Sequence, residues 1–438
     1  MKSLTFLIIG LSIADLLAAI DTTAVSIALP KIARTFDLNI GGVAWAQTIY
    51  ILSLVIFLIP FGKIGDSFGH KKNFFTGLLL FSISSLGSSF APNYILLLFF
   101  RIIQGMGAAI LYTASGALIA HHWKKTEIAF GLTAAFFSIG LLIGPVLGGV
   151  LADQQVLNID GWRWIFLINV PLVVISALLV RKNSTETSHR GKLTKDIIGF
   201  LLLVSTLAFL VLTLTQPLNK LLYCFASLVS AGLLVTLERK QKDPLLEFLI
   251  FKNQTFSAIS IFTAVLMFSL TALTFISTFY LQEVLNLNST KAGLMMIPIF
   301  LGMGTFSLIA GFIHNWKVGT IISSCLIIAG LVIMAGVSPQ DSYFSGLFWG
   351  FLVVSAGAGF MMTNTFAAAL GSVRKNLTGV AAGYINTVQQ IGALSGLSFV
   401  AYKDILKDYA NLYWILAFIS TIALAASLAV KNTKGERQ

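Results

Sequence analysis

The 438-residue chain is 57% hydrophobic, only 11% charged, and carries a formal net charge of +12. A soluble globular domain has about 25% charged residues, so this composition excludes that class and indicates a membrane protein. The basic residues lie beside the ends of apolar runs, where anionic lipid and insertion topology account for them, so nucleic-acid binding is not expected.

Apolar runs recur from one end of the chain to the other, each long enough to cross about 30 Å of hydrocarbon as a helix. The sequence therefore predicts an all-α integral membrane protein with fourteen transmembrane helices. Their expected ranges are 5–29, 44–62, 73–91, 94–119, 128–151, 163–180, 196–215, 219–237, 255–280, 291–313, 317–337, 344–370, 377–400 and 410–430.

The distribution of Lys and Arg predicts how these helices are oriented. Basic residues gather in alternate connecting segments, such as 63–72, 181–195 and 239–242. Cytoplasmic segments of membrane proteins carry such an excess. The bias holds along the chain only for an even number of helices, so we expect a multi-pass protein of the cell membrane with both termini in the cytoplasm.

A repeated loop suggests two halves. Residues 62–72 have the pattern G-x-x-x-D-x-x-G-x-K, and residues 311–319 keep the opening Gly, an aromatic residue, a Lys and a late Gly. The two copies are eight spans apart, whereas two six-helix halves would separate them by six, so two helices are inserted between the halves. We expect an N-terminal six-helix bundle at 1–182, a linker with two inserted helices at 183–240, and a C-terminal six-helix bundle at 241–438. Two bundles around a central cavity are a known transporter plan.

Two acids lie inside the first apolar run, Asp15 and Asp21. A carboxylate at membrane depth is costly when ionised, so it tends to hold a proton, a cation or a partner. The two are about 9 Å apart along a helix and about 120° apart around it, so they cannot share one proton, but both could border a wide cavity. Two titratable groups in one membrane helix suggest proton-coupled transport. A hydrogen bond to a neighbouring helix is the alternative role for Asp15.

The fourth and fifth runs carry further patterns. Arg101 lies inside its run, where it must snorkel, pair or line a wet cavity, and Gln104 shares its face one turn on. Gly105 and Ala109 permit close helix packing. In the fifth run, glycines at every fourth position form a stripe that another backbone can approach, proline permits a kink, and the first glycine must serve another contact. The residues of this pattern are Gly131, Gly140, Gly144, Pro145, Gly148 and Gly149.

These patterns together resemble the major facilitator superfamily, and specifically its fourteen-span drug:proton antiporter family, over essentially the whole chain. Asp21-Thr22-Thr23 with Ala28-Leu29-Pro30 is similar to that family's first-helix signature. The segment from Arg101 to Ala109 resembles the helix 4 motif, and Gly131 to Gly149 the antiporter motif. The gating loop of the superfamily is matched by Gly62, Asp66, Gly69 and Lys71. The sequence Trp162-Arg163-Trp164-Ile165-Phe166, with Asn169 and Pro171, is also typical of the fourteen-span group.

The resemblance implies alternating access, with export of hydrophobic, often cationic compounds against proton entry. Asp21 would be the acid for substrate and proton, Arg101 would assist proton transfer, and Asp66 would latch the closed cytoplasmic gate. Ser67 and His70 stand where the gating loop usually has basic residues, which implies a weaker or pH-sensitive latch. Asp15 has no counterpart in the signature.

Aromatic, amide and thioether side chains would give the cavity a forgiving contact surface. The candidates are Tyr50, Tyr112, Phe275, Glu283, Met361, Asn386 and Gln389. Glu283 could contact a cation, or its side chain could instead be exposed at the outer membrane interface.

The sequence leaves three functions open. The first is a multidrug/proton antiporter, the second a proton-coupled exporter of one metabolite or antibiotic, and the third a membrane enzyme or scaffold. The chain shows no metal or nucleophile cluster on a loop and no G-x-x-x-x-G-K-[ST] pattern, so we expect no enzyme, no ATP use, no metal and no cofactor. The expected partners are small-molecule drugs, protons and membrane lipid, with a monomer as the default oligomeric state.

Overall fold

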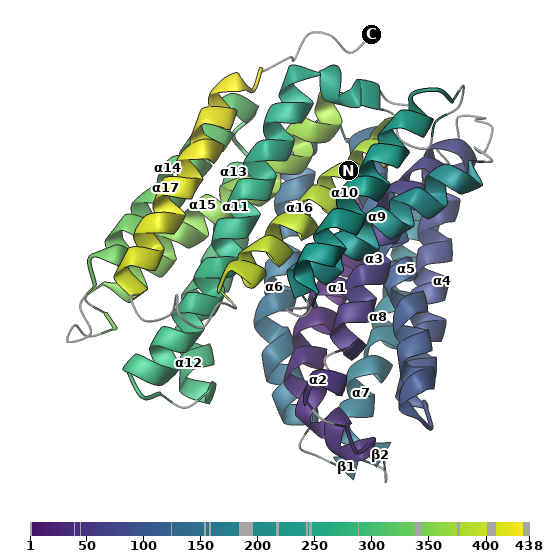
Figure 1. The fold of residues 1–438 in the computed structure, drawn as a ribbon, viewed down its shortest axis with the longest axis horizontal. Helices are drawn as coiled ribbons and strands as arrows, with labels where there is room; N and C mark the ends of the chain where they lie inside the picture. The colour runs from purple at the N-terminus through teal and green to yellow at the C-terminus, as the bar shows by residue number, and fades with distance from the viewer. Residues whose placement is uncertain are drawn as a thin grey trace.

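The computed structural model describes residues 2–431, except for 39, 44, 124, 153–154, 157–158, 184–195, 216–218, 242–243, 245–247, 288, 338–342, 345, 375–376 and 401–408. Within these residues the protein is almost entirely helical (Figure 1), which confirms the all-α class. Two short strands, β1 (Gln155–Val156) and β2 (Ile159–Asp160), pair antiparallel.

The first group of helices packs together as one bundle. It comprises α1 (Lys2–Thr35), α2 (Ile40–Val43), α3 (Trp45–Phe68), α4 (His70–Ser89), α5 (Tyr94–His122), α6 (Thr126–Ala152), α7 (Gly161–Leu167) and α8 (Asn169–Asn183). Helix α1 packs on α6 and α8, and α5 packs on α3 and α4.

The second group has the same kind of packing. It comprises η1 (Phe248–Lys252), α11 (Gln254–Phe279), the π-helical η2 (Tyr280–Val284), α12 (Ser289–Met295), α13 (Ile297–Ala310), α14 (Trp316–Ala335), α15 (Leu347–Gly371), α16 (Thr378–Val400) and α17 (Tyr409–Ala429). Helix α15 packs on α13 and α14, and α11 packs on α16 and α17.

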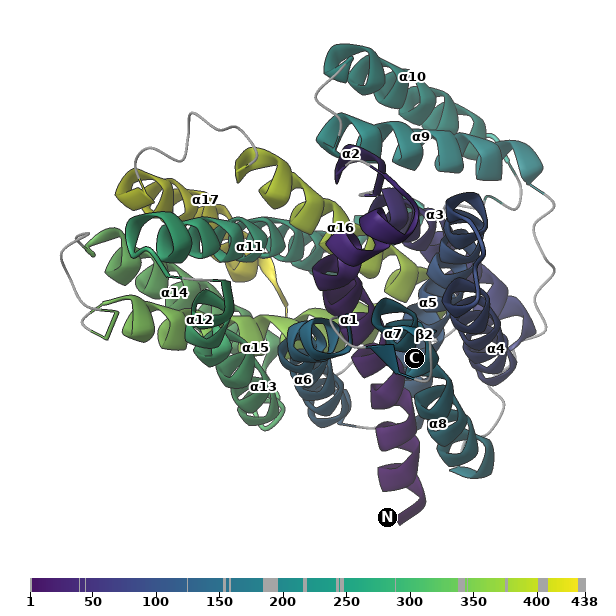
Figure 2. The ribbon, with the colours of Figure 1, turned by 90° about the horizontal axis from the view of Figure 1, so that it is seen from below.

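Between these groups in the chain come α9 (Ile197–Thr215) and α10 (Lys220–Glu238), which pack on each other. Figure 2 shows the pair at the periphery, where α9 touches α3 and α16. The two large groups meet directly along α3 with α16 and along α6 with α13.

Each of the fourteen predicted ranges coincides with a helix or with two consecutive helices. Among the described residues, eleven helical segments are long and apolar enough to cross a membrane. Helix α9 has a shorter apolar segment, Ile198–Leu214, and α4 and α16 are not among the eleven. The hydropathy of α16 is lowered by its three amide side chains, all of which face a central cavity.

Glycines allow α6 to lie close against α1. A Cβ atom at Gly140 would lie 2.7 Å from the Cβ of Ala19, and one at Gly148 would lie 2.6 Å from the carbonyl oxygen of Ala24. The third glycine of the stripe, Gly144, contacts Thr23 in the same way. Any side chain at these positions would push the two helices apart, so the stripe fixes the position of α1 beside the cavity.

Candidate functional site

A cavity lies between the two groups of helices. Its walls come from α1, α3, α5 and α6 on one side and from α11, α15 and α16 on the other. Phe130 of α6 and Phe366 of α15 line it and stack with ring centroids 5.6 Å apart, so the two groups touch at this point. The cavity therefore has a surface that includes both halves of the chain.

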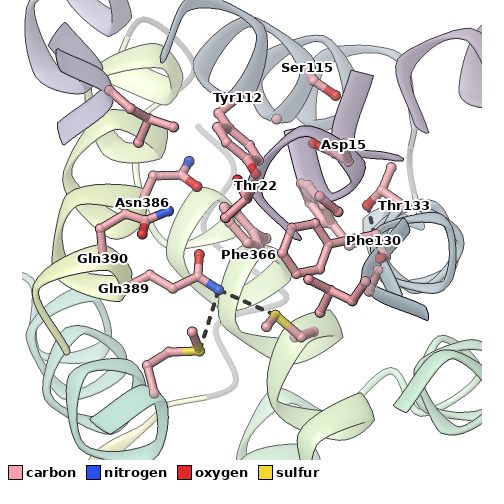
Figure 3. Close-up of a pocket in the computed structure, with 18 of the residues that line it drawn as sticks. Asp15, Thr22, Tyr112, Ser115, Phe130, Thr133, Phe366, Asn386, Gln389 and Gln390 are labelled. Carbon is pink, nitrogen blue, oxygen red and sulfur yellow. Dashed lines mark hydrogen bonds between the residues drawn. The ribbon is translucent and has the colours of Figure 1, made fainter. Parts of the chain in front are cut away.

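Asp15 is the carboxylate of this cavity. Figure 3 shows it on α1 near Tyr112 and Ser115 of α5 and Thr133 of α6, all of which line the cavity. Its side chain makes no hydrogen bond to the described part of the chain, so the alternative role as a link to a neighbouring helix is not found there. A half-buried acid in this setting is available to a cation or a proton from the cavity.

Amide side chains form the opposite wall. Asn386, Gln389 and Gln390 lie on one face of α16 because their spacing of three and four residues matches the helix repeat. The Nε2 atom of Gln389 donates to the sulfur atoms of Met362, at 3.3 Å, and Met267, at 3.8 Å. Both thioethers also line the cavity.

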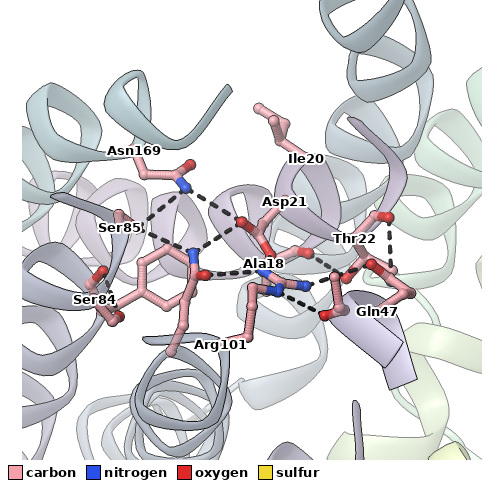
Figure 4. Close-up of polar contacts among 12 residues, drawn as sticks. Ala18, Ile20, Asp21, Thr22, Gln47, Ser84, Ser85, Arg101 and Asn169 are labelled. Atoms are coloured by element: carbon pink, nitrogen blue, oxygen red, sulfur yellow. Dashed lines mark hydrogen bonds and ion pairs between the residues drawn. The ribbon is translucent and has the colours of Figure 1, made fainter. Parts of the chain in front are cut away.

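Asp21 lies elsewhere. It is fully buried and is not part of the cavity wall, although the next residue, Thr22, is. Its Oδ2 atom lies 2.6 Å from Nη1 of Arg101, and its Oδ1 atom accepts a hydrogen bond from Gln104 Nε2 at 2.8 Å (Figure 4). Asn169 of α8 approaches the same oxygen at 3.4 Å. The expectation that Asp21 faces the cavity is therefore corrected, because the roughly 120° between the two acids around α1 turns only one of them toward the cavity.

Arg101 is held from several sides. It is fully buried, its Nε atom donates to the carbonyl oxygen of Ala46 at 3.0 Å, and Nη1 also donates to Gln104 at 2.8 Å. It pairs with Asp21 rather than snorkelling to the interface. Desolvation makes such a pair strongly dependent on both partners.

Tyr50 stands between the ion pair and the cavity. Its ring lines the cavity, and the guanidinium carbon of Arg101 lies 4.1 Å from the centroid of that ring. A cation over an aromatic face is attracted by the ring quadrupole. Tyr50 therefore contacts both the cavity and the buried ion pair.

One end of the cavity is closed by contacts between the two groups of helices. We call it the latch end, defined by Gly62 and Asp66 of α3 together with Gly379 and Val380 of α16. The carboxylate of Asp66 accepts hydrogen bonds from the backbone N–H groups of Gly379, at 2.9 Å, and Val380, at 2.8 Å. These are orphan donors in the first turn of α16, where an acid is favourable. Gly62 and Gly379 lie in direct contact, so neither position has room for a side chain.

The rest of the gating loop supports this contact. His70 Nε2 lies 3.0 Å from Oδ1 of Asp66, which places an imidazole beside the latch carboxylate. Gly69 has φ 105°, a conformation that favours glycine, and it is the one residue between the end of α3 and the start of α4. Lys71 donates to the carbonyl oxygen of Arg181 at 3.2 Å, within the same half.

A second contact closes the same end between α6 and α13. Ser307 Oγ donates to the carbonyl oxygen of Gly131 at 2.9 Å, and a Cβ atom at Gly131 would lie 2.5 Å from the carbonyl oxygen of Ser307. Trp316 Nε1 donates to Oε1 of Glu127 at 3.1 Å. Trp316 belongs to residues 311–319, the second copy of the loop at 62–72. Each copy therefore contacts the opposite group of helices.

The remaining predicted cavity residues separate into two sets. Tyr50, Tyr112, Asn386 and Gln389 line the cavity. Met361 is fully buried and does not, whereas its neighbour Met362 does. Phe275 is exposed on the outer surface of α11 and is not part of the cavity wall, which corrects its expected place. The side chain of Glu283 lies outside the described residues.

Sequence reasoning passed over several residues that the structure brings to the site. Ser115 and Thr133 line the cavity, and Ser307 bridges the halves. Small polar residues in apolar helices are common, so nothing in the pattern distinguished them. Among the described residues, no group of three His, Cys, Asp or Glu side chains is placed to hold a metal ion.

The family profile of the Major Facilitator Superfamily matches residues 11–397. The chain belongs to this superfamily. It is therefore a membrane transporter.

The names of similar proteins in the superfamily refer to different transported compounds. The chain is 29% identical over 413 residues to "Drug efflux pump JefA" of Mycobacterium tuberculosis, covering 91% of this chain and 80% of that protein. It is 27% identical over 447 residues to "Riboflavin transporter RibZ" of Clostridioides difficile, covering 97% of each. The human organic anion transporter MFSD10 (TETRAN) has a similar fold, with TM-score 0.70, 15% identity and 98% of each chain covered.

Proposed function

We propose that the protein exports hydrophobic, often cationic drugs and toxic compounds across the cell membrane in exchange for protons. The proposal includes fourteen spans, arranged as six-helix bundles at 1–182 and 241–438 with two inserted helices at 183–240. Both termini would lie in the cytoplasm, as would the latch end. The observation that carries it is Asp15, a carboxylate in a cavity shared by both halves.

Asp15 provides a simple way to couple cargo binding to proton binding. A carboxylate at membrane depth is stable when it holds a proton or when it faces a cation. Cargo and proton then compete for the same anion, and each lowers the affinity for the other by the same factor. The aromatic rings of Tyr112, Phe130 and Phe366 supply apolar surface and π faces for a lipophilic cation.

The buried pair of Asp21 and Arg101 supplies a second proton site. Cargo in the cavity has no direct contact with Asp21, because Asp21 is not in the cavity wall. A proton on Asp21 would remove the charge that holds Arg101 at 2.6 Å and would release α1 from α5. We propose that this release, passed through Tyr50, links protonation to the movement of the two bundles.

Alternating access requires the latch end to open. The bonds from Asp66 to α16 and from Ser307 to Gly131 would break in the inward-facing state, while the rigid α1–α6 contact would move with its bundle. The structure has these bonds formed, which supports its assignment to a state closed toward the cytoplasm. The proton gradient is the proposed energy source, and no cofactor is needed.

A second candidate is a proton-coupled exporter dedicated to one metabolite or antibiotic. The amide wall of Asn386, Gln389 and Gln390 favours it, because placed amides select for hydrogen-bonding cargo. The riboflavin name of one relative is in keeping with a narrow cargo range within the superfamily.

A cargo panel tests the proposal and separates the two candidates. Cells without their own pumps would express the wild type, Asp15→Asn or the charge-retaining control Asp15→Glu, and efflux of several unrelated cationic dyes and drugs would be measured. We expect efflux by the wild type and the control, none by Asp15→Asn, and loss of efflux by the wild type and the control after the proton gradient is collapsed. Efflux by Asp15→Asn equal to wild type would refute the role of this acid, and efflux of one compound alone would favour the second candidate.

A further inference from the structure

The cavity has two polar walls of different chemistry that face one another. Figure 3 shows Asp15 on α1 at one side and Asn386, Gln389 and Gln390 on α16 at the other. The stacked rings of Phe130 and Phe366 also line the cavity. A cargo that satisfies only Asp15 would leave the amide wall against an apolar surface.

Amides in such a position have a strong preference for a polar partner. Each amide group carries a carbonyl acceptor and two N–H donors, and leaving them unsatisfied in a dry site is unfavourable. Asn386 is buried and its Nδ2 atom donates to the carbonyl oxygen of Ala382 at 2.8 Å, within its own helix. Gln390 is half-buried and makes no hydrogen bond to the described part of the chain.

Gln389 is the most informative of the three. Its amide nitrogen donates to two thioether sulfur atoms, of Met362 and Met267, and thioethers are weak acceptors. A carbonyl, hydroxyl or ring-nitrogen acceptor on a cargo would therefore compete for this nitrogen. Figure 3 shows the carbonyl oxygen of Gln389 directed away from the two sulfur atoms, so it is open to a donor on the same cargo.

The methionines make this exchange easy. Met267 and Met362 both line the cavity, and methionine is unbranched and adapts its shape at low cost. When Gln389 turns to a cargo, the two thioethers can repack against the apolar part of the same molecule. The two weak hydrogen bonds to sulfur thus position the Gln389 amide but are easily exchanged for a bond to cargo.

We infer that the preferred cargo is a bipolar aromatic cation, with its positive group toward Asp15 and a hydrogen-bonding group, such as an amine, amide or hydroxyl, at the far edge toward Gln389. This inference rests on the proposed function, whose cation site is Asp15. It goes further in assigning α16 the discrimination between lipophilic cations that carry a polar edge and those that do not.

The test compares two cationic probes on the purified full-length protein in detergent by equilibrium dialysis. Ethidium is a planar aromatic cation with two aromatic amines, and tetraphenylphosphonium is an aromatic cation without any hydrogen-bonding group. The variants are Gln389→Leu and, as a second replacement that fits a methionine-lined site, Gln389→Met. Tetraphenylphosphonium also reports whether each variant is folded, since its site at Asp15 is unchanged.

We expect either substitution to raise the Kd for ethidium about tenfold, the size of one lost hydrogen bond, and to change the Kd for tetraphenylphosphonium by less than about twofold. Asp15→Asn should weaken both probes. An unchanged Kd for ethidium, or a loss for tetraphenylphosphonium as large as that for ethidium, overturns the inference. If ethidium binds through Gln389 but is not moved by a pH gradient in liposomes, the proposed function fails while the inference stands.

Discussion

Replacing Asp66 with alanine should shift the transporter away from the state with a closed latch end. The carboxylate accepts two backbone hydrogen bonds, at 2.9 and 2.8 Å, from the first turn of α16. A hydrogen bond to a charged group contributes about 1.5–3 kcal/mol to stability. Because the freed N–H groups bind water in the open state, we assign about 1–1.5 kcal/mol of net stabilisation of the closed state to each bond. The loss of about 2–3 kcal/mol corresponds to a change of about 30- to 150-fold in the ratio of closed to open states.

Distances between spin labels at Lys72→Cys and Arg374→Cys would measure this ratio. Both positions are exposed at the latch end, one in each half, and the two native cysteines would be replaced by serine. We expect one short distance in the starting protein and a dominant long distance in Asp66→Ala. Ser67→Ala, one residue along, removes no bond to α16 and serves as the control. A distance distribution unaffected by Asp66→Ala would show that the latch bonds do not hold the closed state.

Further expectations concern the ion pair, the cavity ring and the helix contacts. Asp21→Asn should abolish proton-driven export yet leave tetraphenylphosphonium binding within about twofold, since that acid is outside the cavity wall; weakened binding would count against two separate sites. Tyr50→Leu should slow export about tenfold by removing the ring over the guanidinium, while Tyr50→Phe keeps it; equal rates for both variants would exclude a role for the ring. Gly131→Val should stop dye efflux because its side chain would collide with α13, whereas Gly149→Val has open space within 4 Å and should match wild type. Similar efflux by the two valine variants, at equal expression, would contradict the contact.

The helical architecture could be predicted because most spans are long apolar runs, and some begin with a capping residue. Asn93, Asn253 and Asn315, for example, each cap the helix that follows them by accepting backbone N–H hydrogen bonds. Such signals are local, so the predicted ranges coincide with helices. The breaks at Ile168 and Met296 within two of the ranges depend on local geometry that composition does not reveal.

The site was less accessible to sequence reasoning, since it depends on which face of α1 meets the cavity. In a helix that packs on protein over most of its surface, apolar residues surround the axis and give no preferred face. The pattern therefore could not tell that Asp15 lines the cavity while Asp21 is paired with Arg101. The bridge from Ser307 to Gly131 joins residues 176 positions apart and likewise leaves no local signal.

We assign the coupling of cation export to proton entry to Asp15, the carboxylate in the shared cavity. Its most direct test is uptake of tetraphenylphosphonium into liposomes with an acidic lumen that contain the purified protein, either wild type or Asp15→Asn. This coupling predicts accumulation by the wild type that disappears when the pH gradient is collapsed, and none beyond empty liposomes for Asp15→Asn. Accumulation by Asp15→Asn that still follows the pH gradient would contradict it.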